Sequence, residues 1–433
     1  MQVEIRHQIK KFWSSFGANY FIVSANSIIQ VGALAFILFP VMSYKLGPSG
    51  FGSLMLIFTV VNFCFPVFSG SMSTCFFRFS KNYEGQNINT FRSSYIYFSS
   101  IVTSVVAICL LAGLPLLNLQ WDDRLVLEWL PYFLVYYLFL SINEVFANIF
   151  TMEQDFFPLL VGRILIFVCV AISIPIYDKY GSPWWILIIG AGPFLSAGFL
   201  LYQVLKKRYI RFKFIDFNII ITLLPVVIIY IIGHSGAWVL SMGDRWLLAS
   251  FNVGMEQVAY LSVAVQASLL SIFPVEMISI LITPIVCNIN SFNDISQGHA
   301  RKSLCIMGIS IIFLATIGLL GGYLYIWLFY DNIYLVNALP LYFVLMLGMF
   351  FYPFLVFARP YVTRFYSPWT IFFTEVISGM FGICVMFLLF SAWGVWGVVV
   401  GRSAGYICKS VIYLIIVQAR LLLIARERRV ISI

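Results

Sequence analysis

The sequence is poor in charge and in groups that could carry out a reaction. Charged side chains make up 10% of the 433 residues, and the chain has three histidines. It has no glycine-rich loop with the lysine that cradles phosphates in ATPases. No loop combines a histidine, a carboxylate and a nucleophile, and the eight cysteines are not spaced as metal ligands are. The sequence therefore predicts no metal site, no ATP hydrolysis and no enzyme.

Long hydrophilic segments are also scarce, whereas long apolar runs are abundant. Hydrophobic residues make up 62% of the chain and the mean hydropathy is +0.97. Uncharged runs exceed the roughly 18 residues that indicate a membrane-spanning helix. We predict an all-α polytopic membrane protein with about twelve transmembrane helices. The predicted ranges are 18–43, 51–76, 93–117, 129–152, 157–177, 183–205, 217–242, 257–286, 303–328, 337–358, 368–391 and 394–418.

Basic residues predict the orientation. A cluster in the middle of the chain, residues 206–213, reads KKRYIRFK. Short basic loops stay on the cytoplasmic side of a membrane. Most other lysines and arginines fall in the termini or in loops on that same side, so we expect both termini to be cytoplasmic, with the chain in a bacterial inner membrane. The net charge of +9 then reflects topology, and no nucleic-acid partner is expected.

The basic cluster also divides two similar halves. We predict an N-terminal six-helix half (1–205), a cytoplasmic linker (206–216) and a C-terminal six-helix half (217–433). Residues 46–54, LGPSGFGSL, share their cadence with residues 253–261, VGMEQVAYL, 207 positions later. Parallel repeats imply a pseudo-two-fold axis along the membrane normal, with a central cavity between halves that rock against each other. This architecture is typical of transporters.

These turns resemble motifs of a known family. The segment LGPSGFG (46–52) is similar to the LGxxxfG turn of Wzx-type O-antigen and polysaccharide flippases, which belong to the multidrug/oligosaccharidyl-lipid/polysaccharide (MOP) exporter superfamily. DRWLL (244–248) followed by EQVAY (256–260) resembles the family passage D+xxLxxxxxxxxVGxY, with Ala259 where glycine is usual, and GVWGV (394–398) resembles its GixGa turn. The resemblance implies a MATE-like fold, with two six-helix halves around a cavity.

Ionisable residues inside predicted spans require an explanation, because each costs roughly 2.5–3.5 kcal/mol on insertion scales. Residues equidistant from a turn share a depth in the membrane. Glu144 and Arg163 are equidistant from the turn near 153, and Glu375 and Lys409 from the turn near 392. We predict an ion pair within each hairpin, although a pair facing a cavity can also break and reform during transport.

Arg402 and Glu276 have no such partner across a hairpin. Arg402 is a candidate anion site and Glu276 a candidate carrier of a proton or cation; the alternative for each is a partner on a non-adjacent helix. Asp244 and Arg245 lie near the outer end of their helix. By resemblance, cations in that passage face the translocation path, although the two residues could equally reach the interface. Arg78 either attracts an anionic head-group or only enforces topology.

We therefore predict a flippase that moves an undecaprenyl-pyrophosphate-linked oligosaccharide to the periplasmic leaflet by alternating access; the glycan itself is implied by the resemblance. No cofactor is expected, and H⁺ or Na⁺ re-entry or downhill product consumption would drive transport. Membrane lipids, and a glycan polymerase and chain-length proteins of the same pathway, are expected partners. The alternatives are a multidrug exporter of the superfamily and a membrane-embedded glycan polymerase or ligase. The candidate anion-binding residues are Arg402, Arg245, Arg163, Lys409 and Arg78, and the candidate ion-coupling residues are Glu276, Glu144, Glu375 and Asp244.

Overall fold

The computed structural model describes residues 21–23, 25–26, 29, 32–83, 87–118, 124–181, 183–210, 215–251, 253–287 and 307–431, and within these ranges it contains helices and no strand. An apolar helix also continues from Met307 into η5 and α11. In chain order the elements are η1 (Ala33–Leu38), α2 (Phe39–Cys64), η2 (Phe65–Ser69), α3 (Gly70–Phe79), η3 (Ser80–Asn82), α4 (Asn87–Asn118), α5 (Arg124–Met152), α6 (Phe157–Tyr180), α7 (Trp184–Lys206), α8 (Phe217–Ser250), α9 (Met255–Cys287), η5 (Leu314–Gly318), α11 (Leu319–Phe329), α12 (Asn332–Met349), α13 (Tyr352–Phe365), α14 (Pro368–Trp393) and α15 (Val395–Ile431).

The predicted all-α transmembrane fold is confirmed. Helices satisfy their own backbone hydrogen bonds, which is what a chain of this hydropathy requires in hydrocarbon. The first two predicted helices are joined within α2 at Gly47, whose φ of 66° is a left-handed conformation that glycine adopts without strain. Counted as one span they give eleven helices apolar enough to cross a membrane in the described part of the chain, and divided at Gly47 they give twelve. Positions 18–20, 24, 27, 28, 30, 31 and 303–306 of the predicted ranges lie outside the described residues.

The tenth predicted helix, 337–358, is wrong as a single element. The structure has α12 ending at Met349 and α13 beginning at Tyr352. Pro353 stands in the first turn of α13, where its missing N–H removes no intrahelical bond. The proline therefore begins a helix instead of kinking a continuous one. The break starts a short helix that carries Arg359 and Arg364, both of which are partly buried.

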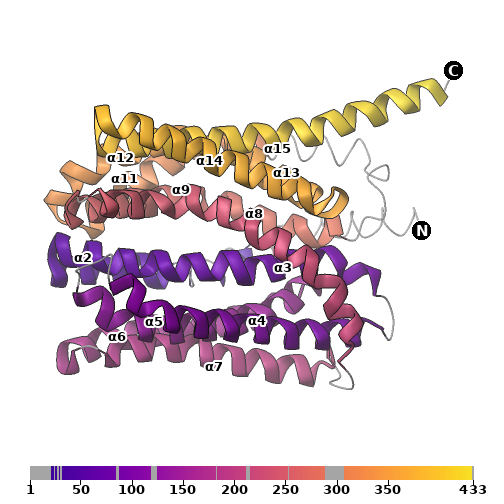
Figure 1. The fold of residues 1–433 in the computed structure, drawn as a ribbon, viewed down its shortest axis with the longest axis horizontal. Helices are drawn as coiled ribbons and strands as arrows, with labels where there is room; N and C mark the ends of the chain where they lie inside the picture. The colour runs from indigo at the N-terminus through magenta and orange to yellow at the C-terminus, as the bar shows by residue number, and fades with distance from the viewer. Residues whose placement is uncertain are drawn as a thin grey trace.

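Figure 1 shows the helices lying side by side in one elongated bundle, with α2 to α7 on one side and α9 to α15 on the other. We call the helices within residues 34–206 the N-terminal bundle. We call α8 together with α9 to α15, residues 217–431, the C-terminal bundle. The predicted linker, 206–216, occupies the connection from α7 to α8, of which residues 211–214 lie outside the described part. We call the end of the molecule at which this connection lies the linker end. Helix α15 projects beyond the other helices at that end (Figure 1).

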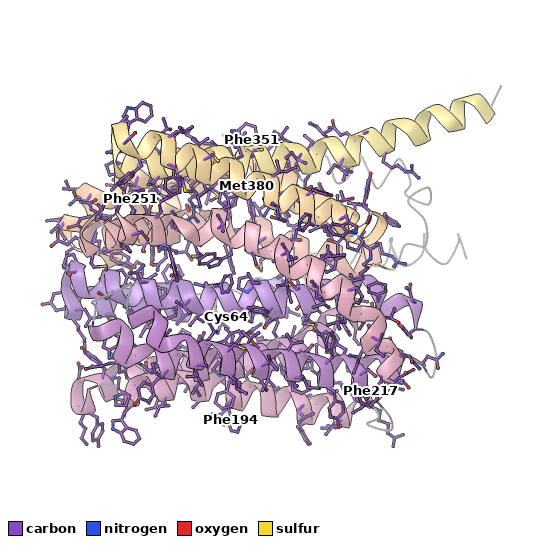
Figure 2. The ribbon with its side chains drawn as sticks, in the orientation of Figure 1. Cys64, Phe194, Phe217, Phe251, Phe351 and Met380 are labelled. Carbon is purple, nitrogen blue, oxygen red and sulfur yellow. The ribbon has the colours of Figure 1, made fainter. Side chains whose placement is uncertain are left out.

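The outer surface is apolar, as a lipid-facing surface must be. Phe194 and Phe217 project from the bundle in Figure 2 and are 55% and 69% exposed. Met380 is likewise exposed, whereas Cys64 is buried between the helices. Hydrophobic side chains in this arrangement face hydrocarbon on the outside and one another on the inside, so the polar residues that remain inside are the ones that require a functional or structural reason.

The two repeated turns of the sequence meet in space at the end opposite the linker. Gly52 of α2 lies so close to α9 that a Cβ atom there would overlap the carbonyl oxygen of Met255. Phe51 packs edge-on against Tyr334 of α12, with ring centroids 6.3 Å apart. The N-terminal and C-terminal bundles are therefore in contact at this end.

Candidate functional site

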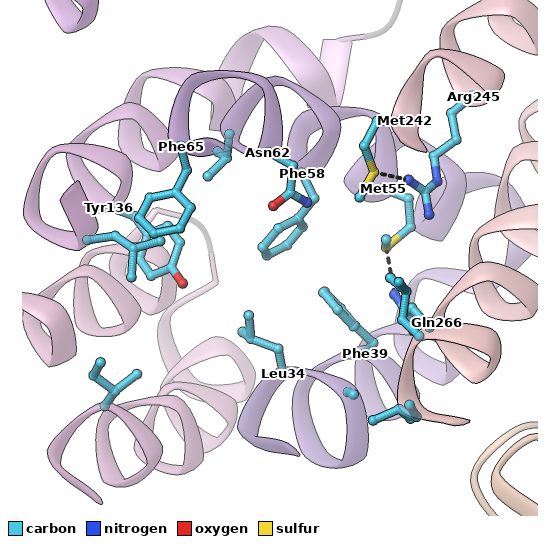
Figure 3. Close-up of a pocket in the computed structure, with 16 residues that line it drawn as sticks. Leu34, Phe39, Met55, Phe58, Asn62, Phe65, Tyr136, Met242, Arg245 and Gln266 are labelled. Atoms are coloured by element: carbon cyan, nitrogen blue, oxygen red, sulfur yellow. Dashed lines mark hydrogen bonds between the residues drawn. The ribbon is translucent and has the colours of Figure 1, made fainter. Parts of the chain in front are cut away.

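A cavity of about 220 Å³ lies between the two bundles. Its wall is mainly apolar and aromatic, and Figure 3 shows the polar ends of Asn62, Arg245 and Gln266 around it. Asn62 comes from α2 in the N-terminal bundle, and Arg245 and Gln266 come from α8 and α9 in the C-terminal bundle. The remaining lining residues are Leu34, Ala35, Phe39, Met55, Phe58, Val61, Phe65, Tyr136, Leu140, Ile166, Met242, Leu269 and Leu270.

Arg245 is the cation of this cavity. Its Nε donates a hydrogen bond to Ser262 Oγ at 2.7 Å, and its Nη1 lies 2.5 Å from Met242 Sδ (Figure 3). The residue is 2% exposed. No carboxylate of the described residues lies within 4.0 Å of its guanidinium. A buried charge without a counter-ion is costly, so this position is suited to receive an anion.

Arg402, the other strong candidate for an anion site, has a carboxylate partner. Its Nη1 lies 2.5 Å from Asp244 Oδ2, and both side chains are 0% exposed. The same nitrogen donates to the carbonyl oxygen of Ser241 at 2.5 Å. This partner lies on α8, which is not adjacent to α15 in the sequence. The structure thus shows the alternative considered for Arg402, a partner on a non-adjacent helix. The Asp244 carboxylate also acts on Arg245, so one carboxylate serves two guanidinium groups and the cluster keeps an excess positive charge.

Both predicted hairpin ion pairs are present. Arg163 Nη2 lies 3.7 Å from Glu144 Oε2, between α5 and α6. Lys409 Nζ lies 2.5 Å from Glu375 Oε2, between α14 and α15, and Tyr413 donates a hydrogen bond to the same carboxylate at 3.0 Å. None of these residues lines the cavity described above. Their candidate roles in anion binding and ion coupling remain predictions.

Glu276 also has a neighbour on a non-adjacent helix. It accepts a hydrogen bond from the Tyr352 hydroxyl of α13, and Arg359 of α13 is the cation that acts on it. Arg359 in turn contacts His234 of α8, with 3.3 Å between Nη2 and Nε2. The sequence analysis gave neither Arg359 nor His234 a role in the site. A single histidine in an apolar run was the available signal, but nothing in the sequence indicated what it faces.

A second cavity, of about 280 Å³, opens beside the first. Leu270 of α9 lines both cavities. The second one lies between η1 and η5, two π-helical turns, which occur frequently at functional sites. Phe36 and Ile317 on its wall are 36% and 58% exposed, so the cavity borders the outer surface of the bundle. Its remaining lining residues are Gly32, Ser271, Phe273, Pro274, Phe313, Gly318, Gly321 and Tyr325.

Solved structures share this arrangement of helices. A MATE crystallised in complex with MaL6 superposes with a TM-score of 0.74 at 14% identity, over 94% of this chain and 97% of that one. The chain has the fold of MATE and MOP superfamily transporters. A MOP superfamily transporter from Pyrococcus furiosus, for which a binding pocket of reverse polarity is reported, gives 0.75 at 15% identity, over 94% and 96%. A eukaryotic MATE transporter, AtDTX14, gives 0.73 at 15%, over 95% and 96%. No protein-family model and no curated protein matches the sequence.

In this MATE fold, Arg78 connects the two bundles at the linker end. From α3 its Nη1 donates to the carbonyl oxygens of Thr363 in α13 and of Tyr366, the residue that follows this helix, at 2.9 and 2.6 Å. Arg364 donates in return to the carbonyl oxygen of Arg78 at 2.9 Å. The bundles are therefore bonded at the linker end and packed together at the opposite end, through Phe51 and Tyr334, with the first cavity enclosed between the two contacts.

We expect Arg78→Met to weaken the contact between the bundles at the linker end. Methionine keeps the apolar stem but removes both donors to α13, and hydrogen bonds from charged groups contribute about 1.5–3 kcal/mol. A cysteine placed at Thr363 should then react faster with a water-soluble maleimide. Lys206→Met, a cation of the same end outside this contact, is the control. Equal labelling rates in all three chains would show that Arg78 does not hold the bundles together.

Proposed function

We propose that this chain is a flippase for an anionic lipid-linked glycan, of the undecaprenyl-pyrophosphate-oligosaccharide class. It would carry the head-group from the cytoplasmic to the periplasmic leaflet of a bacterial inner membrane, with both termini cytoplasmic. The observation that carries the proposal is the position of Arg245, a buried cation with no carboxylate of the described residues within 4.0 Å, on the wall of a cavity between the two bundles. The transporter fold and the motif resemblance described above support the same class.

The chemistry of the cavity suits one part of such a substrate. A pyrophosphate is dianionic or more and must leave water to cross the membrane, so it needs a cation along its path. Arginine presents several donors in a planar fork that matches phosphate oxygens. Asn62 and Gln266 provide amide groups near Arg245 for sugar hydroxyls, and Tyr136 and Phe58 offer rings on which a sugar can stack.

The size of the cavity indicates which part of the cycle the structure represents. Ligand sites usually enclose about 300–1,000 Å³. The first cavity encloses about 220 Å³, which is too small for a pyrophosphate together with several sugars. The bundles must therefore move apart at one end before a lipid-linked oligosaccharide enters, which is the rocking motion expected of two halves around a central cavity.

The second cavity offers a place for the lipid tail. Its wall is almost entirely apolar, it borders the lipid-facing surface, and it meets the first cavity at Leu270. A polyisoprenoid tail left at this gap between the bundles would stay in contact with hydrocarbon while the head-group passes Arg245. Only the polar part of the substrate would then need a polar path.

A multidrug exporter of the same superfamily is the second candidate. The aromatic wall formed by Phe39, Phe58, Phe65 and Tyr136 is the observation in its favour, because apolar drugs bind such surfaces. No aspartate or glutamate lines this cavity among the described residues, and a binding site for organic cations needs one. The reported structures of this fold are transporters, which also favours transport over a glycan polymerase or ligase.

The deciding experiment locates the lipid-linked oligosaccharide when the chain is deleted from a strain that makes it. Intact, unpolymerised units that accumulate on the cytoplasmic leaflet would support the flippase. Single units on the periplasmic leaflet would mean that translocation proceeds without this chain, and would return attention to the polymerase or ligase. Normal glycan display together with increased sensitivity to apolar drugs would support the exporter.

A further inference from the structure

His234 lies at the seam between the two bundles. It belongs to α8 of the C-terminal bundle and is 4% exposed. Its Nδ1 lies 2.8 Å from the hydroxyl of Ser71, which belongs to α3 of the N-terminal bundle. Its Nε2 lies 3.3 Å from Nη2 of Arg359 on α13. His234 therefore connects α8 and α13 of the C-terminal bundle to α3 of the N-terminal bundle. Helix α3 is also the helix that carries Arg78.

The hydrogen bonds around His234 determine where its proton is. Ser71 donates its hydroxyl hydrogen to the carbonyl oxygen of Val67, so its oxygen can only accept from His234 Nδ1–H. Arginine has donors and no acceptor, so the Arg359 N–H must be accepted by a bare Nε2. The two contacts together require a neutral imidazole with its hydrogen on Nδ1. The free lone pair on Nε2 is where a proton would bind.

Charged groups of three further helices act on this imidazole. Arg359 of α13 and Lys409 of α15 oppose a positive charge on the ring, and Glu375 of α14 favours one. Tyr230, one turn earlier on α8, stacks on it with 6.2 Å between ring centroids. Arg359 also interacts with Glu276 of α9. The four charged groups, two cations and two carboxylates, balance only while His234 is neutral, so an added proton disturbs the whole set.

We propose that Nε2 of His234 binds the proton that couples transport to the proton gradient; this rests on the proposed transport function. In the described conformation Arg359 occupies the Nε2 lone pair, so the proton binds when the contact with Arg359 opens. The protonated ring carries N–H groups on both nitrogens, and its Nε2–H then repels the Arg359 guanidinium. Arg359 turns toward Glu276 and Glu375, which already attract it. Protonation thereby holds α13 away from α8 and α3. Because α13 also carries the Thr363 carbonyl group that Arg78 binds, this separation favours opening of the linker end.

Two variants separate proton binding from a structural role. His234→Asn retains a donor toward Ser71, and His234→Gln retains an acceptor toward Arg359, but neither side chain can take up a proton. In proteoliposomes that contain the purified chain and a fluorescent lipid-linked oligosaccharide, we expect an inward pH gradient to accelerate flipping by the wild type. Within each variant, the rate with the gradient should equal the rate without it, so the acceleration is lost whatever the gradient-free rate is. If either variant is accelerated as the wild type is, His234 is not the coupling site.

The same experiment keeps the two proposals apart. A wild type that does not flip the lipid-linked oligosaccharide at all contradicts the proposed function. A wild type that flips it at a rate indifferent to pH gradients leaves the function standing and contradicts the role of His234.

A second measurement needs no substrate. Spin labels at Asn82 and Ser367, two exposed positions on either side of the seam at the linker end, report the separation of the bundles in a chain without native cysteines. Burial and Arg359 disfavour a proton on His234 while the contact is closed, so we expect the label distance to increase only as the pH falls below about 6.5, where a histidine released from Arg359 takes up a proton, and to stay constant in His234→Asn and His234→Gln. A pH-independent distance in the wild type, or an equal increase in the variants, would overturn the proposal.

Discussion

Arg245→Gln should strongly reduce transport of a pyrophosphate-linked substrate while leaving the protein folded. Glutamine keeps a polar side chain at the edge of the cavity and can still donate to Ser262, but it removes the positive charge. Hydrogen bonds to charged groups contribute about 1.5–3 kcal/mol, which corresponds to roughly 10- to 150-fold weaker binding. Surface glycan display in a complemented deletion strain, and flipping in proteoliposomes, measure the loss.

Two controls make this result specific to the cavity. Lys45→Gln removes a cation that pairs with Asp178 away from the cavity, and should leave transport unchanged. Arg245→Lys keeps the charge without the planar fork, and should retain part of the activity. Full transport by Arg245→Gln at normal protein levels would show that the cavity does not bind the anion, and would remove the main support for a flippase.

The sequence predicted well the features that depend on local pattern. Apolar runs predicted the helices, because a helix is the structure that satisfies its own backbone in lipid. The break at 350–351 was missed because Pro353 fits both a kink and a first turn, and the choice depends on what α13 packs against. Neither the close approach of Gly52 to Met255 nor the π-helical turn at 314–318 has a signature in a single sequence.

The contacts of the candidate site were predictable only between helices that follow each other directly in the sequence. Equal distance from a turn brought Glu144 to Arg163 and Glu375 to Lys409, because the two helices of a hairpin are antiparallel. The same reasoning had no access to α8 against α15, which are distant in sequence. It could therefore not find the partner of Arg402, which is the Asp244 carboxylate next to Arg245.

That buried pair leads to the second large effect that we expect. Asp244→Leu should destabilise the protein by about 3–5 kcal/mol, because it leaves the Arg402 guanidinium fully buried and without a counter-ion. Asp244→Leu combined with Arg402→Met should recover most of that loss, since two apolar side chains remove both charges from the interior. Apparent Tm values in detergent for the wild type, both single variants and the double variant complete a double-mutant cycle.

The exposed pair of Lys45 and Asp178 is the matched control, because Asp178 is 59% exposed and such pairs contribute about 0–1 kcal/mol. If Asp244→Leu lowers the Tm no more than Asp178→Leu does, water or lipid must reach Arg402 and the pair is not truly buried. A double variant that is stable but inactive would have a different meaning. In that variant Arg245 is unchanged and only the Asp244–Arg402 pair beside it is missing. The result would show that this pair is needed to hold Arg245 in place at the cavity.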